Sequence, residues 1–397
     1  MRQGTLLIHN GHETDPASGA LGVPVLQTST FDQGPYFSGG PDAKAPEFDY
    51  ARSGNPTRKA LEEIIAALEG GAAGCAFGSG IAAISSALGI FSAGDHVIAA
   101  EDIYGGSYRI LNTFYKRWGL QHTAIDSSRP EEIRRAIRPD TKAIFLESPS
   151  NPLLKITDLK TCIGIAKEAG LVSIIDNTFM TPYLQRPIEL GADIVLHSAT
   201  KFLGGHSDVI SGLAVCATRE LGKRLYAVQN GFGAVPGPWD VWLVIRGIKT
   251  LRVRLEAQER TARFLCGRLR EHPAVAAVYY PGLEDHPGKE IHDAQASGAG
   301  AVFSFKTKTA EQALRFLGRV KLAAAAVSLG GVETIASYPV RMSHASIPPA
   351  ERERLGISDT LVRISTGLED PEDLLEDFEH ALGETNVHPA NAGNYRL

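Results

Sequence analysis

Short apolar runs alternate with helix-sized amphipathic segments through the middle of the chain. Six runs of four or five residues have this character, at residues 96–100, 122–125, 143–146, 171–175, 193–196 and 213–216. Segments with the apolar spacing of helices lie between them, for example at residues 130–137 and 157–169. Strands of this kind, joined by helices, are typical of a largely parallel sheet that is covered on both faces. The pattern therefore predicts an α/β fold.

The segments on either side of this region have a different character. Residues 1–55 mix turn formers with short apolar pieces, which predicts an arm that does not fold alone. Asn55-Pro56 has the N-cap and first-turn proline of a helix that ends near Gly70-Gly71. A helical stretch over 239–270 leads to strands at 299–305 and 361–365 and a terminal helix at 371–382. We therefore expect an arm (1–55), an α/β domain (56–250) and a smaller α+β domain (251–397).

Composition and charge argue against a protein that binds nucleic acid or an anionic membrane. The chain has 397 residues, of which 43% are hydrophobic and 21% charged, as in folded globular proteins. A formal net charge of -5 offers no electrostatic attraction for nucleic acid or an anionic membrane. With no bilayer-length apolar stretch and no secretory signal, a cytoplasmic protein is expected. Four cysteines without C-x-x-C spacing are expected to be buried free thiols rather than disulfides or a metal site: Cys75, Cys162, Cys216 and Cys266.

A single lysine carries the clearest chemical information. Lys201 follows the apolar run 193–196 directly, within the sequence SATKFLGG (198–205), between small hydroxyl residues and a glycine pair. Burial at the end of a strand lowers the pKa of an amine, which suits a lysine that condenses with a carbonyl. We therefore predict that Lys201 anchors pyridoxal phosphate and is also the catalytic base.

Asp176 follows the preceding apolar run and completes a pair with Lys201. Their separation, 201 minus 176, is 25 residues, enough for one strand, crossover and strand. The two residues are therefore expected to face the same crevice. A carboxylate there would keep the pyridine nitrogen protonated, so that the ring withdraws electrons.

The sequence GSGIAA (78–83) has the glycine spacing of a loop that places phosphate on a helix N-terminus. A nicotinamide-dependent dehydrogenase is a distant alternative, since no long strand precedes the loop and Asp95 and Glu101 flank a different predicted strand. A single phosphate is favoured, with the amides of Gly80 and Ile81 as its donors.

Two hydroxyl residues precede Lys201, one on each side of Ala199. Ser198 and Thr200 are two positions apart, so in a strand their hydroxyls would point to the same phosphate. The alternative is that each satisfies a local backbone group.

Motifs along nearly the whole chain resemble those of the Cys/Met-metabolism family of pyridoxal-phosphate enzymes, which includes the cystathionine lyases, cystathionine γ-synthase and methionine γ-lyase. The motifs are YARSGNPT (50–57), SGIAA (79–83), YGG (104–106), ESPSNP (147–152), DNT (176–178), the lysine segment, SLGGVE (328–333) and RISTGLED (363–370). The resemblance implies fold type I, like that of aspartate aminotransferase, and a homotetramer of two active dimers. It also implies that Tyr50 and Arg52, on the arm, hold the cofactor phosphate of the neighbouring subunit. A surface aromatic–cation pair is the alternative for these two residues.

The resemblance further implies roles for residues of the two domains. Tyr104 matches the tyrosine that stacks on the pyridine ring and moves protons, with a core aromatic as the alternative. Arg363 matches the residue that binds the substrate α-carboxylate, which suits bidentate guanidinium geometry. Asn151 and Ser328 match residues that support this carboxylate and the cofactor, with loop capping as the alternative.

The expected reaction is elimination from a sulfur amino acid, in which Lys201 takes the Cα proton. Loss of the thiolate from Cβ of L-cystathionine gives homocysteine, pyruvate and ammonia, whereas loss from Cγ gives cysteine and 2-oxobutyrate. Gly106 stands where methionine γ-lyases usually carry cysteine, and Val327 where many γ-lyases and γ-synthases carry glutamate. The stretch YPVRMSHA (338–345) is most similar to bacterial cystathionine β-lyases. We therefore expect a cystathionine β-lyase, with cystathionine γ-lyase or γ-synthase as alternatives.

Overall fold

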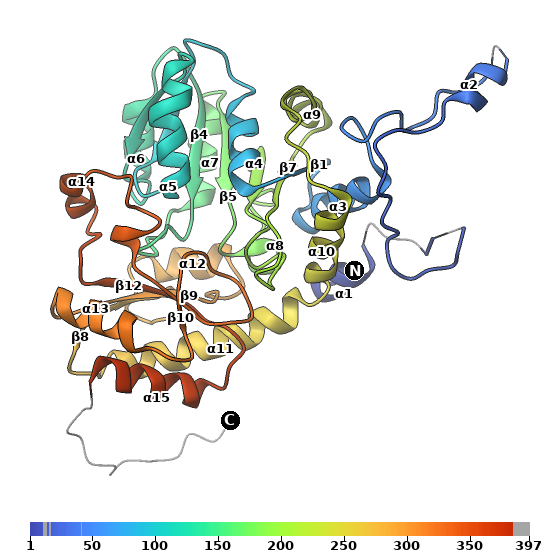
Figure 1. Ribbon diagram of the computed structural model, residues 1–397. Coiled ribbons are helices and arrows are strands. Elements are labelled where there is room, and N and C mark those ends of the chain that lie inside the picture. The colour runs from blue at the N-terminus through green and yellow to red at the C-terminus, as the bar shows by residue number, and fades with distance from the viewer. Residues whose placement is uncertain (11–13, 16, 41, 384–397) are drawn as a thin grey trace.

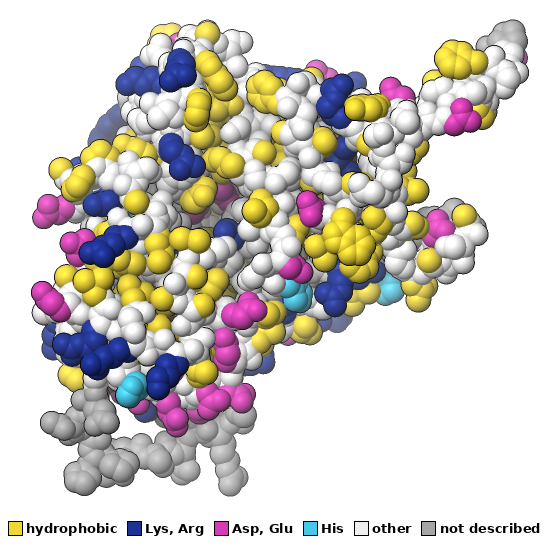
Figure 2. All heavy atoms as spheres, in the orientation of Figure 1, with side chains coloured by type: hydrophobic (Ala, Val, Ile, Leu, Met, Phe, Trp, Pro, Cys, Tyr) yellow, Lys and Arg dark blue, Asp and Glu magenta, His cyan; other side chains and the backbone are white. Residues whose placement is uncertain are grey.

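The computed structural model describes residues 1–10, 14–15, 17–40 and 42–383. Within them the strands form two sheets, one of seven strands in the order β1-β7-β6-β5-β4-β2-β3 and one of five in the order β10-β11-β12-β9-β8. Figure 1 shows the larger sheet with its helices above the smaller one, while the part of the N-terminal arm that carries α2 (Gly34–Ser38) stands away from both. Figure 2 shows the same arm projecting from the body of the molecule.

The larger sheet confirms the prediction of an α/β fold. Each of the six predicted runs forms a strand, and β2 to β6 are parallel to their neighbours in this series, whereas β7 is antiparallel to β6. The strands are β2 (His96–Ala100), β3 (Gln121–Ile125), β4 (Thr141–Glu147), β5 (Val172–Asp176), β6 (Ile194–His197) and β7 (Gly212–Cys216). Apart from Ala124 and Val172, their apolar side chains are almost completely buried, and each large one contributes about 1.5–3 kcal/mol to stability. All four cysteines are buried and free, as predicted.

A seventh strand, β1 (Ala73–Phe77), was not predicted, because its sequence AGCAF is short and interrupted by glycine. A strand of five residues therefore precedes the glycine loop at 78–83, where no long strand was expected. However, β1 lies at the edge of the sheet and pairs antiparallel with β7. A dinucleotide-binding unit needs a parallel strand at this position, so the argument against a dehydrogenase holds for a different reason.

The helices that cover this sheet begin and end where local sequence rules place them. In α3 (Pro56–Glu69) the Asn55 side chain accepts from the amides of Thr57 and Arg58, and Gly70 ends the helix with a left-handed backbone. The predicted helices at 130–137 and 157–169 are α6 (Pro130–Ala136) and α7 (Leu159–Glu168). The others are α4 (Gly80–Leu88), α5 (Gly105–Ile110), a π-helix (Leu111–Tyr115), α8 (Thr181–Leu184) and α9 (Arg219–Phe232).

The single helix expected over 239–270 is two helices, α10 (Pro238–Ile248) and α11 (Leu251–Leu269). The break has a local cause: the Gly247 carbonyl accepts from the Thr250 hydroxyl at 3.1 Å and from Arg254 Nη2 at 2.8 Å. These side chains replace the amide that a continuous helix would supply.

The smaller sheet contains the strands predicted at 299–305 and 361–365, which are β9 (Val302–Thr307) and β12 (Leu361–Ser365), and the terminal helix is α15 (Pro371–Leu382). Edge-to-face contacts between Phe305, Phe316 and Phe378 join this sheet to α13 and α15, with ring centroids 5.2 and 5.1 Å apart. The remaining elements are β8 (Val275–Tyr279), α12 (Lys289–Gln295), α13 (Ala310–Arg319), β10 (Ala324–Ala325), β11 (Ile335–Ser337), a 3-10 turn (Pro339–Arg341) and α14 (Pro349–Arg354). Residues 384–397 of the predicted third part lie outside the described residues.

The arm contains two short helices, α1 (Gln3–His9) and α2 (Gly34–Ser38). Only α1 is anchored on the body, where Gln3 Nε2 donates to the carbonyls of Leu68 and Pro182. No helix among the described residues has the length and apolar character needed to cross a membrane.

Candidate active site

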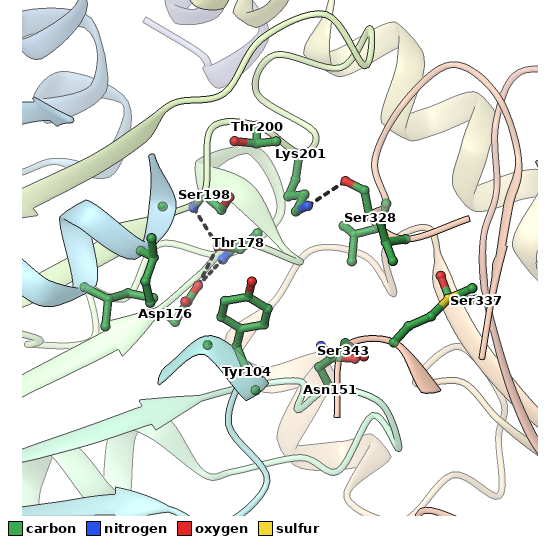
Figure 3. Close-up of a pocket in the computed structure, with 18 of the residues that line it drawn as sticks. Tyr104, Asn151, Asp176, Thr178, Ser198, Thr200, Lys201, Ser328, Ser337 and Ser343 are labelled. Atoms are coloured by element: carbon green, nitrogen blue, oxygen red, sulfur yellow. Dashed lines mark hydrogen bonds between the residues drawn. The ribbon is translucent and has the colours of Figure 1, made fainter. Parts of the chain in front are cut away.

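A pocket lies at the carboxyl ends of β4, β5 and β6, on the side where the smaller sheet packs. This edge is where α/β sheets usually bind ligands. Ten of the twelve residues singled out from the sequence line it: Gly80, Ile81, Tyr104, Asn151, Asp176, Ser198, Thr200, Lys201, Ser328 and Arg363. Figure 3 shows Tyr104, Asp176, Lys201 and Ser328 around this pocket.

Lys201 projects into this pocket from a turn. The strand β6 ends at His197, and the Lys201 amide donates to the Ser198 carbonyl at 3.1 Å, so residues 198–201 are not the strand extension that was expected. The Lys201 Nζ donates to Ser328 Oγ at 2.6 Å. Burial, and then repulsion from the Arg363 guanidinium, lowers the pKa of Lys201 to about 8. A larger share of this amine is therefore neutral and nucleophilic near physiological pH than in an ordinary lysine.

Asp176 lies at the end of β5, beside the strand that leads to Lys201. The two strands are parallel neighbours, with Asp176 paired to Leu196, which confirms the predicted strand, crossover and strand. Its Oδ1 accepts from the Thr178 amide at 3.0 Å and from the Thr178 hydroxyl at 2.6 Å. Burial raises the pKa of Asp176, while these hydrogen bonds and attraction to His197 oppose the rise. A protonated ring nitrogen is the kind of partner that would keep this buried carboxylate ionised.

The N-terminus of α4 faces the turn before Lys201. The Ser79 side chain accepts from the Ala82 amide at 3.1 Å, while the first amides of a helix, here those of Gly80 and Ile81, have no acceptor within it. A Cβ on Gly80 would lie 2.7 Å from Ser198 Oγ, so only glycine allows this approach. The close approach leaves a cradle of amides and a hydroxyl that fits a phosphate.

The Thr200 hydroxyl forms hydrogen bonds with the backbone of Ser211, the residue before β7. Its hydroxyl donates to the Ser211 carbonyl at 3.2 Å and accepts from the Ser211 amide at 3.0 Å. Since Ser198 and Thr200 lie in a turn, strand alternation is not what brings both of them to the pocket.

Arg363 lies on β12 at the far side of the pocket and is 3% exposed. Its Nη1 donates to Asn151 Oδ1 at 3.0 Å, and its Nη2 donates to the Ser328 carbonyl at 2.7 Å and to Ser337 Oγ at 3.1 Å. Its Nε has no hydrogen-bond partner in the part of the chain that the structure describes. Burial lowers the pKa of Arg363 to about 10. A buried guanidinium with an unused donor beside a pocket is suited to bind a carboxylate.

Ser328 connects the lysine and the arginine. Its hydroxyl accepts from Lys201 and its carbonyl accepts from Arg363, and its φ of 88° is unusual for a residue other than glycine. Strain of this kind costs about 1–3 kcal/mol and is concentrated at functional sites. The neighbouring Gly330, with φ of 81°, brings this loop against the backbone of Lys201 and Phe202.

Tyr104 precedes α5, and its ring is 40% exposed in the pocket. The Tyr104 amide donates to Glu147 Oε2 at 3.0 Å, and Glu147 is buried next to Asp176 in the strand register. Burial, and then repulsion from Asp176, raises the pKa of Glu147. A Cβ on Gly106 would overlap the Tyr104 ring, so glycine at this position permits the observed ring orientation.

A family model described as Cys/Met metabolism PLP-dependent enzyme matches residues 4–383. The chain belongs to this family. It is 54% identical to cystathionine beta-lyase MetC of Bacillus subtilis (strain 168), over 96% of both chains. It is 51% identical to cystathionine gamma-lyase of the same organism, over 96% of this chain and 99% of the relative.

Solved structures of the family have the same fold. A cystathionine gamma-lyase from Lactobacillus plantarum, complexed with L-serine, has a TM-score of 0.92 and 43% identity, covering 96% of this chain and 98% of that one. The fold class predicted from the sequence, the mainly parallel sheet of fold type I with a smaller α+β part, is therefore confirmed. The family depends on PLP (pyridoxal phosphate), and the arrangement of amide cradle, Asp176 and Lys201 fits that cofactor.

Two residues singled out from the family's motifs do not reach this pocket. Tyr50 and Arg52 are exposed on the arm, where the guanidinium lies 5.7 Å from the Tyr50 ring centroid and donates to the carbonyl and the side chain of Asn230. In a single chain they form the surface aromatic–cation pair that was the alternative.

Conversely, Arg109 lines the pocket and was not singled out. It lies four residues after Gly105 on α5, and this helical spacing was the available sequence evidence.

Proposed function

We propose that this chain is a PLP-dependent cystathionine β-lyase, which converts L-cystathionine and water to homocysteine, pyruvate and ammonia. The observation that carries the proposal is the arrangement of Lys201, Ser328 and Arg363, in which one strained serine links the amine to the carboxylate-binding guanidinium. This arrangement would place the Cα of a bound amino acid within reach of the lysine. The four buried, free cysteines support a reducing compartment such as the cytoplasm.

We propose that three parts of the pocket hold the cofactor. The amides of Gly80 and Ile81 and the hydroxyl of Ser198 would bind its phosphate, as would the Thr200 hydroxyl once its proton turns from the Ser211 carbonyl. Asp176 would bind its ring nitrogen and Lys201 its aldehyde carbon. Tyr104 would stack on the ring. Bound in this way, PLP supplies an electron-withdrawing ring that stabilises negative charge at the substrate Cα.

The protein residues would then orient the substrate and move its proton. Arg363, supported by Asn151, would bind the α-carboxylate through its unused donor and fix the Cα–H bond. Lys201, with a pKa lowered to about 8, would take the Cα proton as a general base. The Ser328 hydroxyl would hold the amine on the Cα side of the pocket, and Tyr104 would move a proton at the departing sulfur.

A cystathionine γ-lyase is the second candidate, because a relative of that name is 51% identical over 96% of this chain. Val327, at the rim of the pocket, favours the β-lyase. Val327 is 64% exposed there and offers no charge to the distal ammonium of a substrate held for loss at Cγ. The 54% identity to a β-lyase over the same length favours it as well.

Product analysis on L-cystathionine tests the proposed function. The expected products are pyruvate and homocysteine in equal amounts, measured by chromatography after reaction with excess PLP. O-Succinylhomoserine with cysteine serves as a control for γ-replacement and is expected to give no cystathionine. Predominance of 2-oxobutyrate and cysteine would establish the γ-lyase instead, and absence of all four products would contradict both candidates.

We further propose that a second copy of the chain completes the site, as part of a homotetramer. The exposed Tyr50 and Arg52, the arm that carries them and the exposed Trp239 on α10 support such a contact. In this arrangement Arg52 would bind the phosphate held by the neighbouring subunit.

Subunit mixing tests this arrangement. When the Arg52→Ala and Lys201→Ala proteins are dissociated and reassociated together, activity is expected to return, because one site of each hybrid dimer has an intact arm and an intact lysine. Mixing Asp176→Ala with Lys201→Ala is the control, since both residues belong to the same site and no hybrid site is intact. Lack of recovery in the first mixture would contradict the exchange of arms.

A further inference from the structure

A second group of buried polar side chains lies behind the pocket, at the end of α3. It consists of Glu69, the last residue of α3, His197, the last residue of β6, and Asn177, the first residue after β5. Each is at most 1% exposed, and none of the three is among the described residues that line the pocket. Their chain neighbours Asp176 and Ser198 do line it.

One carboxylate oxygen of this group joins the ends of two strands. Glu69 Oε1 accepts from His197 Nε2 at 2.7 Å and from Asn177 Nδ2 at 3.0 Å. Asn177 directly follows Asp176, and His197 directly precedes the turn that carries Lys201. Glu69 therefore binds the residues adjacent to both parts of the proposed cofactor site.

Side-chain alternation puts this contact on the opposite side of the sheet from Asp176. Since Asp176 pairs with Leu196, the next residue, His197, points to the other face. On the pocket side the Ser198 amide donates to the Thr178 hydroxyl at 2.8 Å, and Thr178 donates to Asp176. The ends of β5 and β6 are thus tied from both faces.

Burying these polar side chains costs free energy that a contact serving only stability would not require. Glu69 Oε2 and His197 Nδ1 are buried and have no hydrogen-bond partner among the described residues. Buried polar contacts of this kind are often replaced by apolar residues without loss of stability, because burying the polar groups costs desolvation free energy. Stability alone therefore gives little reason for a carboxylate and an imidazole here.

We propose that Glu69 and His197 are positioning residues, which fix the separation between Asp176 and Lys201 by tying Asn177 to His197. This inference rests on the proposed function, since it concerns how the cofactor ring and the substrate Cα are presented to those two groups. His197 has an additional electrostatic effect, because its attraction opposes the rise in the pKa of Asp176 that burial causes.

The test compares Glu69→Ala with a matched variant on the same helix, Glu62→Ala. Glu62 accepts from the Ala76 amide at 2.9 Å and from Gln229 Nε2 at 3.2 Å, and these bonds reach β1 and α9 instead of β5 and β6. Glu69→Ala is expected to lower kcat at least about tenfold with KM changed less than about threefold, because small misplacements of reacting groups have large effects on rate. It is also expected to weaken PLP binding in equilibrium dialysis and to reduce the visible circular dichroism of the bound cofactor. Glu62→Ala is expected to lower Tm and leave kcat and the visible spectrum unchanged.

A second pair of variants does not depend on the folding of Glu69→Ala. Glutamine at position 197 offers an Nε2 donor where histidine has one, so His197→Gln is expected to recover most of the kcat and circular dichroism lost in His197→Ala. Equal losses in both, or no loss in either, would overturn the inference, as would a folded Glu69→Ala with the wild-type spectrum and kcat. A wild-type protein with no visible PLP band would instead contradict the proposed function itself.

Discussion

Replacing Lys201 with alanine is expected to lower kcat on L-cystathionine by about 10³-fold or more, because a general base at the reacting carbon contributes up to about four orders of magnitude. The structure places no other amine of the described residues in the pocket lining, so nothing there replaces the lost base. The visible absorbance band of lysine-bound PLP is expected to disappear as well. Steady-state kinetics and the absorbance spectrum of the purified variant provide the two measurements.

Lys155→Ala is the matched control for this variant. Lys155 is partly buried and pairs with Glu101 at 3.5 Å and Asp102 at 3.9 Å, close to the pocket but outside its lining. Its loss is expected to leave kcat within about threefold of wild type, since partly exposed ion pairs contribute little. Methylamine added to Lys201→Ala is expected to restore part of the rate. If Lys201→Ala kept more than a tenth of wild-type kcat, the proposed base would be another group.

The sequence was sufficient for the central architecture because burial on both sheet faces leaves a strong pattern. All six apolar runs form strands, and Asn55-Pro56 and Gly70 bound α3 as predicted. The misses occur where a strand is short or where side chains take over a backbone hydrogen bond. The strand β1 is too short and glycine-rich to stand out, and the break between α10 and α11 depends on Arg254 binding the Gly247 carbonyl.

Much of the candidate site could also be predicted from the sequence. Spacing alone placed Asp176 and Lys201 at the same end of two adjacent parallel strands, because that relation is set by the length of one crossover. Motifs pointed to Ser328 and Arg363, but the positive φ of Ser328 and the unused Arg363 Nε appear only in three dimensions. The contact between Glu69 and His197 spans 128 positions, and no local pattern relates two such residues. Tyr50 and Arg52 remain a prediction about a second copy of the chain.

Replacing Arg363 with leucine is expected to raise KM for L-cystathionine about 10- to 100-fold, since each hydrogen bond to a charged group contributes about 1.5–3 kcal/mol. Arg363→Lys keeps the charge and loses the planar fork, so its KM is expected to lie between those of wild type and Arg363→Leu. Arg270→Lys, which alters an exposed arginine paired with Asp285, is the control and is expected to leave KM unchanged. An unaltered KM in Arg363→Leu would place the substrate carboxylate elsewhere.

The same variants have a second, independent consequence for Lys201. Burial, and then the positive charge of Arg363, lowers the pKa of Lys201 to about 8 in the wild type. Removing that charge makes the ammonium form less costly, so the pKa of Lys201 rises and the neutral amine forms only at higher pH. Uptake of PLP by the apoenzyme, followed by its visible absorbance, is therefore expected to have a higher pH midpoint in Arg363→Leu than in the wild type. In Arg363→Lys the charge remains and the midpoint is expected to stay near that of the wild type, so equal midpoints in all three proteins would exclude the electrostatic coupling.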